Sequence, residues 1–379
     1  MAQATPTTCN WLCAGTEFFS ALLAAIDSAE KSVCLEVYIF TDSSLGKRFR
    51  EALVRAQGRG ARVRVLLDAA GSYYLPENFW QPLRDAGGEV RRFNPIAFKR
   101  LTIRDHRKLV VCDGKIAFVG GFNIASEYEG DGVNCGWCDL GMKVEGPMVA
   151  GLAASFEEMF SRAEFRHKYF IRLRKTGAKK SVTLPAERLL FSGPGWGRNP
   201  YRRALHQDLR RARSVQIIGA YFLPPWRLRR DLLRVMRRGG QVQLILPAKS
   251  DVPISLLAAQ SLYRRLLGGK VEIYEYQPQI LHAKLIIVDN IVYSGSSNLD
   301  TRSLQINYEL MIRFADKDIV RESREIFAAQ LAHCQPVTSE TWRKSRTFWR
   351  RLKQRWAYFL LSRIDPYVAR RQWRALPDE

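Results

Sequence analysis

One motif occurs twice in this chain, and its surroundings are repeated with it. The pattern His-x-Lys-x-x-x-x-Asp appears at His106, Lys108 and Asp113 and again at His282, Lys284 and Asp289. Each copy leads to a glycine-rich turn that ends in asparagine, at 120–123 and at 295–298. Upstream, the apolar segment 32–40 resembles the segment 214–222. A duplication of this extent predicts two copies of one folding unit that together form a single site.

Both copies show the same order of elements between the first strand and the motif. A basic amphipathic helix is followed by an apolar run typical of a buried strand and by a further β-rich stretch. These segments are 45–59, 62–67 and 88–93 in the first copy and 227–238, 241–246 and 270–276 in the second. An amphipathic helix is expected to begin near Thr16. Strands that alternate with helices predict an α/β fold, with each lobe a mixed, mostly parallel sheet flanked by helices.

The repeat divides the chain into four parts. We expect an N-terminal lobe at 1–165, a basic linker at 166–190 and a C-terminal lobe at 191–336, each lobe holding one motif. The tail at 337–379 has no counterpart in the first half.

Composition narrows the class of partner. Lys and Arg number 60 against 37 Asp and Glu, which leaves a formal net charge of +23 and predicts an anionic partner, nucleic acid or an acidic membrane. The seven cysteines are scattered, so we expect no disulfide framework and a reducing cytosol. Cys135-x-x-Cys138 has no second pair, so a zinc site is not expected. No stretch approaches the ~20 apolar residues that cross a bilayer, so the protein is expected to be soluble or peripheral.

The repeated residues suit the chemistry of a phosphodiester. On a strand, positions i and i+2 share a face, so each motif presents an imidazole beside an ammonium group. One neutral histidine can attack phosphorus while the other, protonated, donates to the leaving oxygen. Lys108 and Lys284 would neutralise charge on the phosphoryl oxygens, so neither a metal nor another cofactor is required. Asp113 and Asp289 lie between apolar runs and are expected at hairpin corners rather than in direct catalysis.

Further residues complete the predicted site. Each imidazole needs an acceptor that orients its other nitrogen. We assign Asp139 to His106 and Glu309 to His282, because the two carboxylates follow the motifs at similar offsets. The alternative is that both are ordinary carboxylates at strand edges. The amides of Asn123 and Asn298 are expected to bind phosphoryl oxygens.

The paired motifs resemble those of the phospholipase D superfamily. The likeness spans about residues 14–335, and several segments are similar to bacterial cardiolipin synthases. These are Glu36-Val-Tyr38, Gly120–Asn123, Glu145-Gly-Pro147, Tyr221-Phe222, Gly295–Ser303 and Asn307-Tyr-Glu309. The lack of N-terminal transmembrane helices favours the synthase B type.

The resemblance implies a fold and a reaction. It implies two lobes related by a pseudo-twofold axis and metal-independent phosphatidyl transfer through a phosphatidyl-histidine, with phosphatidylglycerol as substrate and cardiolipin as product. It also implies that His106 is the nucleophile and His282 the acid and base, although the reverse assignment stays open. Two departures are visible: the second motif is followed by a hairpin one residue shorter, and Gly121 stands where serine is commoner.

The tail favours a membrane partner over nucleic acid. Between Thr341 and Arg374 basic residues alternate with aromatic rings, a pattern typical of a helix that lies in a membrane interface. The alternative is a helix packed on the body with its arginines in water. We therefore expect a peripheral protein on the cytoplasmic side of the inner membrane, with no nucleic-acid partner. A phospholipase D-type hydrolase, a nuclease of the same superfamily and a non-catalytic adaptor are the alternatives, and the acceptor alcohol stays open.

Overall fold

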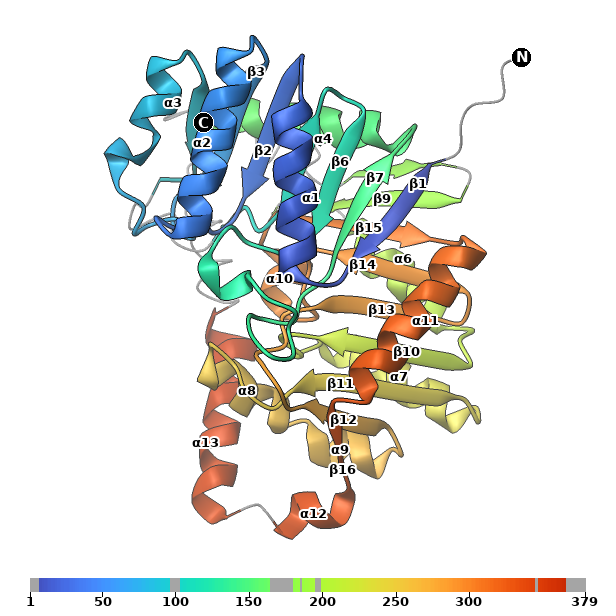
Figure 1. Cartoon of the computed structure of the whole chain (residues 1–379). Helices are drawn as coiled ribbons and strands as arrows, with labels where there is room; N and C mark the ends of the chain where they lie inside the picture. Colours follow the sequence, from blue (N-terminus) through green and yellow to red (C-terminus); the bar gives the residue numbers. More distant parts are fainter. Residues whose placement is uncertain are drawn as a thin grey trace, which may run out of the picture.

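Two mixed β-sheets, one in each lobe, form the framework of the molecule (Figure 1). The computed structural model describes residues 7–95, 103–163, 180–184, 186–194, 199–344 and 347–365.

The N-terminal sheet has seven strands. In spatial order they are β1 (Thr8–Leu12), β7 (Gly141–Glu145), β6 (Ile116–Gly120), β5 (Leu109–Cys112), β2 (Ser32–Val37), β3 (Arg62–Asp68) and β4 (Glu89–Phe93). The helical elements of this lobe are α1 (Gly15–Ser28), α2 (Ser44–Gly58), η1 (Glu77–Trp80), α3 (Gln81–Asp85), η3 (Ser126–Tyr128) and α4 (Met148–Arg162). The predicted N-terminal helix and the helix and strands before the first motif are confirmed within a few residues.

The C-terminal sheet has nine strands. In spatial order they are β16 (Cys334–Val337), β12 (Glu272–Tyr276), β11 (Gln241–Pro247), β10 (Ser214–Gly219), β13 (Lys284–Val288), β14 (Ile291–Gly295), β15 (Glu309–Phe314), β9 (Glu187–Ser192) and β8 (Lys180–Thr183). Its helices are α6 (Pro200–Leu209), α7 (Trp226–Arg237), α8 (Pro253–Gln260), α9 (Tyr263–Gly268), α10 (Thr301–Gln305) and α11 (Lys317–Leu331). The core order β5-β2-β3-β4 of the first sheet recurs as β13-β10-β11-β12, so the predicted duplication is structural.

Antiparallel pairs outnumber parallel pairs, which corrects the expectation of mostly parallel sheets. Among the described strands of the two sheets, parallel neighbours occur in β2-β3-β4 and β10-β11-β12. The motif strands β5 and β13 run antiparallel to β2 and β10. Each motif strand forms a hairpin with the strand that follows it, and a hairpin is antiparallel by construction. The hairpin after β13 has two loop residues and the one after β5 has three, as the shorter spacing predicts.

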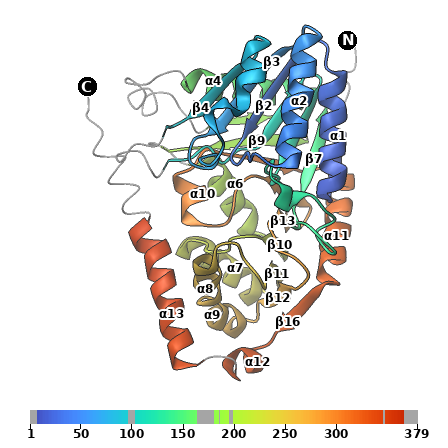
Figure 2. The same ribbon diagram turned by 60° about the vertical axis from the view of Figure 1, so that its left-hand side comes forward.

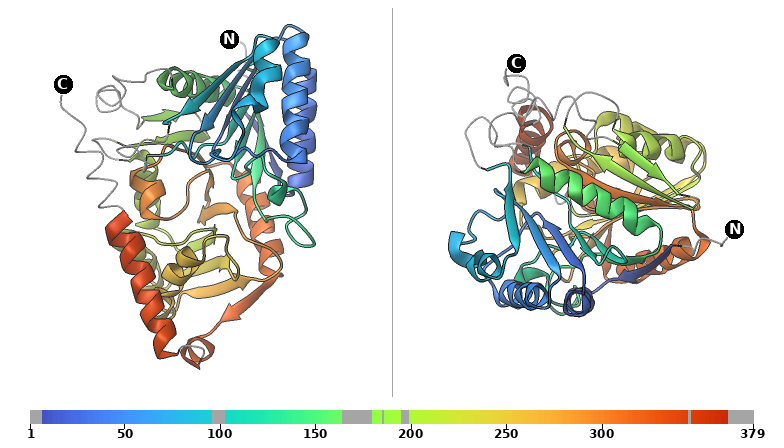
Figure 3. Two further views of the ribbon diagram at one scale, coloured as in Figure 1. Left: turned by 90° about the vertical axis from the view of Figure 1, so that its left-hand side faces the viewer. Right: turned by 90° about the horizontal axis from the view of Figure 1, so that it is seen from above.

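Three apolar clusters hold the lobes together. An outer cluster packs α1 and α2 on the first sheet, another packs α6, α7 and α9 on the second, and a central cluster includes α4, α11 and the facing sides of both sheets. Figure 3 shows α4 and the pair α1 and α2 on opposite faces of the first sheet. In β5, Leu109 and Val111 belong to the central cluster, whereas Val110 and Cys112 belong to the outer one. The motif strand is therefore buried on both faces, and the lobes share one core.

The C-terminal lobe begins before residue 191. β8 and β9 pair with each other and β9 pairs with β15, so Lys180–Thr183 and Glu187–Ser192 belong to the second sheet and not to a linker. The rest of the predicted linker, 166–179, lies outside the described residues.

The tail forms helices that pack on the C-terminal lobe. They are α12 (Ser339–Lys344), α13 (Phe348–Phe359) and a π-helical turn, η4 (Leu360–Ile364). α13 runs along the lobe against α8 (Figure 2) and buries Gln354 and Ala357. Its outer side exposes Phe348, Trp349 and Trp356. In the part of the chain that the structure describes, no helix is both long and apolar enough to cross a bilayer.

Candidate active site

Short backbone bridges join the two lobes at the motifs. The His106 N–H donates to the carbonyl of Tyr308 at 3.0 Å, and the His282 N–H donates to the carbonyl of Cys138 at 2.7 Å. The residues before the histidines, Asp105 and Leu281, form parallel bridges with Tyr308 and Cys138. The start of each motif strand thus lies beside a segment of the opposite lobe.

These bridges pair the histidines with carboxylates across the lobes, which corrects the predicted assignment. Nδ1 of His106 lies 3.1 Å from Oε2 of Glu309, and Nδ1 of His282 lies 2.6 Å from Oδ2 of Asp139. The sequence offsets favoured the opposite pairing. Glu309 directly follows Tyr308 and Asp139 directly follows Cys138, so each bridge delivers its carboxylate to the histidine of the other lobe. Both predicted carboxylates lie beside an imidazole, but each contacts the histidine that was assigned to the other.

Both motif lysines lie beside their histidines, as the strand geometry predicts. Nζ of Lys108 donates to the carbonyl of His106 at 2.8 Å. Nζ of Lys284 lies 2.8 Å from Nδ1 of His282 and also bonds that residue's carbonyl. All four side chains are buried. Burial lowers the pKa of Lys108 to about 7 and lowers that of Lys284 as well.

The two imidazoles differ in their electrostatic surroundings. Burial lowers the pKa of His106 well below its usual value, and the charges of Lys108 and Lys284 lower it further. Burial and Lys284 also lower the pKa of His282, but the carboxylate of Asp139 acts in the opposite direction. Burial raises the pKa of Glu309 to about 8, against the charge of Lys108. His106 is therefore the histidine held more firmly in the neutral form.

The carboxylates of Glu309 and Asp139 have different neighbours at equivalent positions. Oγ of Ser296 donates to Oε2 of Glu309 at 2.5 Å. The equivalent residue in the first lobe is Gly121, and a Cβ there would lie only 2.1 Å from Oδ1 of Asp139. The absence of a side chain at Gly121 thus makes room for the Asp139 carboxylate, which is a spatial reason for the departure from serine noted in the sequence.

The two asparagines have different surroundings. Asn123 accepts from the Ile39 N–H at 3.1 Å and donates to the hydroxyl of Tyr128 at 2.8 Å, so it ties the end of β2 to the turn after β6. Asn298 is buried, and its Oδ1 has no hydrogen-bond partner among the described residues. A role in binding phosphoryl oxygens stays a prediction for both.

The motif aspartates do not reach the site. Asp113 and Asp289 have φ angles of 55° and 49° and lie in the hairpin turns, at the far ends of the motif strands from the histidines. Seven residues of extended chain span roughly 20 Å. Oδ1 of Asp113 accepts from the N–H groups of Lys31 and Ser32, and Oδ1 of Asp289 accepts from that of Ser214. Both anchor a neighbouring strand, in agreement with the turn role expected of them.

Aromatic rings surround the imidazoles, a feature that the motifs did not predict. The Tyr38 ring lies 4.8 Å from that of His106. His282 lies 5.3 Å from Tyr128, 5.8 Å from Trp137 and 6.1 Å from Tyr221 between ring centroids. Among the described residues, no group of His, Cys, Asp or Glu side chains is arranged to hold a metal ion.

A buried ionic cluster lies behind His106 on the central side of the sheet. The guanidinium of Arg107 lies 3.0 Å from Oε2 of Glu36 and donates to Oγ of Ser155 at 2.8 Å. Burial raises the pKa of Glu36 well above its usual value and raises that of Asp105 as well, and the charge of Arg107 acts in the opposite direction on both.

At the equivalent positions of the second lobe, the described side chains are apolar. The positions equivalent to Glu36, Asp105 and Arg107 are occupied by Ile218, Leu281 and Ala283, all in the central apolar cluster. The sequence alignment of the two copies contained this difference at the motif itself, where His106 is flanked by charged residues and His282 by apolar ones. The lobes are therefore alike in fold and unlike behind their histidines.

Comparison with known proteins places the chain in a family. A family described as "Cardiolipin synthase, PLD-like domain" matches residues 22–135 and 205–331, one segment for each motif. Cardiolipin synthase 1 of Bacillus cereus is 30% identical over 380 residues, which cover 96% of this chain and 73% of that protein. Cardiolipin synthase B of Salmonella typhimurium is 31% identical over 361 residues, which cover 93% and 87%.

A solved structure shares the fold. The phosphatidylserine synthase of Haemophilus influenzae superposes with a TM-score of 0.77 at 17% identity and covers 95% of this chain and 94% of its own. This likeness supports the two-lobed fold, while the sequence matches establish the family. The chain belongs to the cardiolipin synthase family, whose members carry phospholipase D-like domains.

Proposed function

We propose that this protein is a phosphatidyltransferase that makes cardiolipin from phosphatidylglycerol by a two-step displacement on His106. The observation that carries the proposal is the crosswise pairing of two buried imidazoles with carboxylates, beside two buried lysines. The family and the names of its relatives support a phospholipid substrate.

In the first step His106 attacks the phosphorus atom of the donor lipid. Its Nδ1–H donates to Glu309, which leaves the lone pair of Nε2 available. A bond forms between Nε2 and phosphorus, and the bond from phosphorus to the glycerol oxygen breaks. The proton that this oxygen needs comes from His282, whose protonated form is stabilised by Asp139.

In the second step His282 accepts the proton of the incoming hydroxyl, and its oxygen displaces Nε2 of His106 from phosphorus. A second phosphatidylglycerol then yields cardiolipin, and water yields phosphatidic acid. Lys108 and Lys284 stabilise the phosphoryl oxygens in both steps, because ammonium groups in a buried site interact strongly with developing charge.

The membrane is the proposed location of the substrate. The net charge of +23 suits an anionic surface, and α13 exposes Phe348 and Trp349 to 71% and 69% beside several arginines. A groove of about 670 Å³ between the end of α13 and the start of α7 is lined by both apolar and basic side chains, among them Trp226, Phe359 and Arg363. We place the protein peripherally on the cytoplasmic side of the inner membrane.

Product analysis tests the reaction. Purified protein is incubated without divalent metal with phosphatidylglycerol vesicles and, separately, with single-stranded and duplex DNA, and products are identified by mass. Cardiolipin and glycerol are expected, and DNA is expected intact. Cut DNA without cardiolipin would show a nuclease, and phosphatidic acid alone would show a hydrolase.

A trapping experiment tests the roles of the histidines. A phosphatidyl ester of p-nitrophenol needs no acid for departure, so the His282→Ala variant should release a burst of nitrophenol and retain phosphatidyl label on His106. His333, exposed and outside the site, provides the control variant His333→Ala with normal turnover. Label on any residue other than His106 would reject the assignment.

A further inference from the structure

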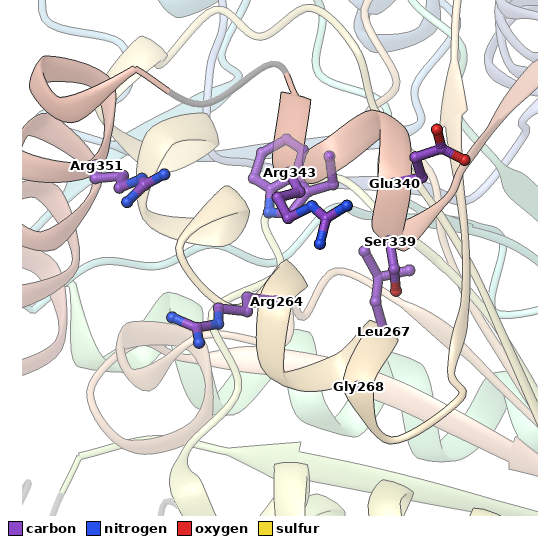
Figure 4. Close-up of a pocket in the computed structure, with 8 residues that line it drawn as sticks. Arg264, Leu267, Gly268, Ser339, Glu340, Arg343 and Arg351 are labelled. Carbon is purple, nitrogen blue, oxygen red and sulfur yellow. The ribbon is translucent and has the colours of Figure 1, made fainter.

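A basic pocket lies where α9, α12 and α13 meet, on the C-terminal lobe and outside the active site. Its volume is about 600 Å³. The residues that line it are Arg264, Leu267, Gly268, Ser339, Glu340, Trp342, Arg343 and Arg351. Figure 4 shows the guanidinium groups of Arg264, Arg343 and Arg351 around the same opening, each from a different helix.

The three arginines lack an acidic partner within the described chain. No ion pair joins Arg264, Arg343 or Arg351 to a described carboxylate, and the one acid in the lining, Glu340, pairs with Lys344 at 2.7 Å. Three cations that converge without counter-charge repel one another unless an anion binds between them. The pocket therefore carries a net positive charge that no described side chain neutralises.

One aromatic side chain lines the pocket and others lie near it in the sequence of α13. Trp342 is buried and packs on Tyr263 with ring centroids 4.8 Å apart, and the guanidinium of Arg350 lies 5.6 Å from the centroid of the Trp342 ring. At the start of α13, Phe348 precedes Arg351 by three residues, so the two share a side of the helix. The side chain of Phe348 is exposed to 71%.

We propose that this pocket binds the phosphate of an anionic phospholipid headgroup in the membrane surface, as a second lipid site apart from the active centre. Guanidinium groups bind phosphate oxygens with paired, charge-assisted hydrogen bonds. The rings of Phe348 and Trp349 are exposed and can enter the apolar part of the membrane interface beside the headgroup. This contact is possible with a lipid and not with a soluble phosphate, so we expect a lipid.

A lipid bound in this pocket would orient the C-terminal lobe on the membrane, because of where the pocket lies on α13. α13 has twelve residues and is therefore about 18 Å long. The pocket lies at its first turn, whereas the turn after its end, through Asp365, binds Arg302 of α10 at 2.7 Å, close to the second asparagine turn. A lipid bound at the first turn would hold the lobe against the membrane along the length of α13. The inference rests on the proposed function only in taking the partner to be a lipid surface.

Vesicle binding by the full chain tests the site. The variant Arg264→Gln/Arg343→Gln/Arg351→Gln is compared with wild type for sedimentation with phosphatidylglycerol vesicles and with neutral phosphatidylcholine vesicles. Loss of three arginines near an anionic surface is expected to weaken binding to phosphatidylglycerol vesicles on the order of 100-fold. The matched control, Arg203→Gln/Arg210→Gln/Arg211→Gln on and after α6, removes the same charge from exposed arginines and should stay within about threefold of wild type.

Two further measurements separate the alternatives. Turnover of monomeric short-chain phosphatidylglycerol should be the same in the triple variant and wild type, because the pocket does not contact the reacting groups. Absence of turnover in both would reject the proposed function and leave the vesicle result to decide the lipid site. Equal loss in the triple variant and its control would overturn the inference. So would vesicle binding kept in the triple variant while binding of inorganic phosphate or DNA is lost.

Discussion

The imidazole of His106 in the N-terminal lobe binds the carboxylate of Glu309 in the C-terminal lobe, with Nδ1 and Oε2 3.1 Å apart. The reciprocal pair joins His282 to Asp139 at 2.6 Å. Neither lobe therefore contains a complete pair of imidazole and carboxylate. The central apolar cluster, continuous between the sheets, keeps both pairs in register, so the site depends on the packing of the two lobes.

The crosswise pairing predicts that a variant of each carboxylate impairs the same catalytic step as a variant of the histidine it contacts. Asp139→Asn should impair the acid and base steps of His282, and Glu309→Gln should impair attack by His106. Each change is expected to lower kcat by roughly 10²–10⁴-fold, because an imidazole without its carboxylate loses its orientation and favoured tautomer. Single-turnover kinetics with the nitrophenyl ester separates them, since only Glu309→Gln should slow the burst.

Double variants give the control for this prediction. His282→Ala combined with Asp139→Asn should be little worse than His282→Ala alone, since the carboxylate acts through that histidine. Asp139→Asn combined with Glu309→Gln should show losses that are closer to additive. If Asp139→Asn instead slowed the burst step, Asp139 would be acting on His106.

The sequence predicted the site's residues better than their partners. The duplication predicted the two α/β lobes and the placement of each histidine beside its lysine, because periodicity and motif spacing report local structure. The partner of each imidazole depends on bridges between segments far apart in the chain, such as that of Asp105 with Tyr308, and no local pattern encodes them. The strands before residue 191 were missed because they lie outside the repeated segments that the sequence comparison matched: β9 takes the place in the second sheet that β1 takes in the first, and β8 is the edge strand beside it.

The motif aspartates should affect stability and not chemistry. Asp113→Ala removes a carboxylate that accepts backbone N–H groups of Glu30, Lys31 and Ser32. Loss of these charge-assisted bonds is expected to lower the free energy of unfolding by about 2 kcal/mol, with kcat per folded molecule unchanged. Urea unfolding measures the free energy of unfolding, and the turnover rate divided by the concentration of folded protein gives kcat. Asp42→Ala, at an exposed pair with Lys47, should cost at most about 0.5 kcal/mol. A large fall in kcat for Asp113→Ala with normal stability would place Asp113 in the chemistry.

Removing the whole ionic cluster behind His106 should destabilise the protein less than removing only one of its members. Arg107→Met leaves the buried carboxyl groups of Glu36 and Asp105 without the guanidinium that favours their charged forms, which is expected to lower the free energy of unfolding by about 3–5 kcal/mol. The triple variant Glu36→Ile/Asp105→Leu/Arg107→Ala copies the second lobe and should recover most of that loss. Urea unfolding measures both, and Arg213→Met, at an exposed arginine, serves as the control. A triple variant less stable than Arg107→Met would contradict this account.

The buried lysine predicts the pH dependence of the first step. Burial lowers the pKa of Lys108 to about 7, so the free enzyme loses this positive charge as pH rises through neutrality. His106 stays neutral until pH falls well below 6.5, because its pKa is lowered by burial and by the lysines. With the nitrophenyl ester, which needs no acid, kcat/KM should therefore fall above about pH 7 and hold on the acid side. Lys108→Arg keeps its charge at every pH and should abolish the alkaline fall at a reduced rate. An unchanged alkaline limb in that variant would assign the titration to another group.

Gly121 and Ser296 occupy equivalent positions and support their carboxylates in opposite ways, by leaving space and by donating a hydrogen bond. Gly121→Ser would place a Cβ only 2.1 Å from Oδ1 of Asp139, so the carboxylate must move from its position beside His282. A displacement of that size in a catalytic pair is expected to lower kcat on the order of 100-fold. Ser296→Gly removes the 2.5 Å hydrogen bond to Glu309 and the bond that Oγ accepts from the Leu310 N–H at 3.0 Å, but it does not push the carboxylate away, so it should cost less, roughly 10-fold.

The pair of variants also separates the two steps. Gly121→Ser acts on Asp139 and should leave the nitrophenol burst intact while slowing transfer to the acceptor, whereas Ser296→Gly acts on Glu309 and should slow the burst. Ser296→Ala, which keeps the Cβ and removes only the hydroxyl, is the control and should behave as Ser296→Gly. A burst slowed by Gly121→Ser and not by Ser296→Gly would mean that Asp139 serves the nucleophile, and the roles of His106 and His282 would have to be exchanged.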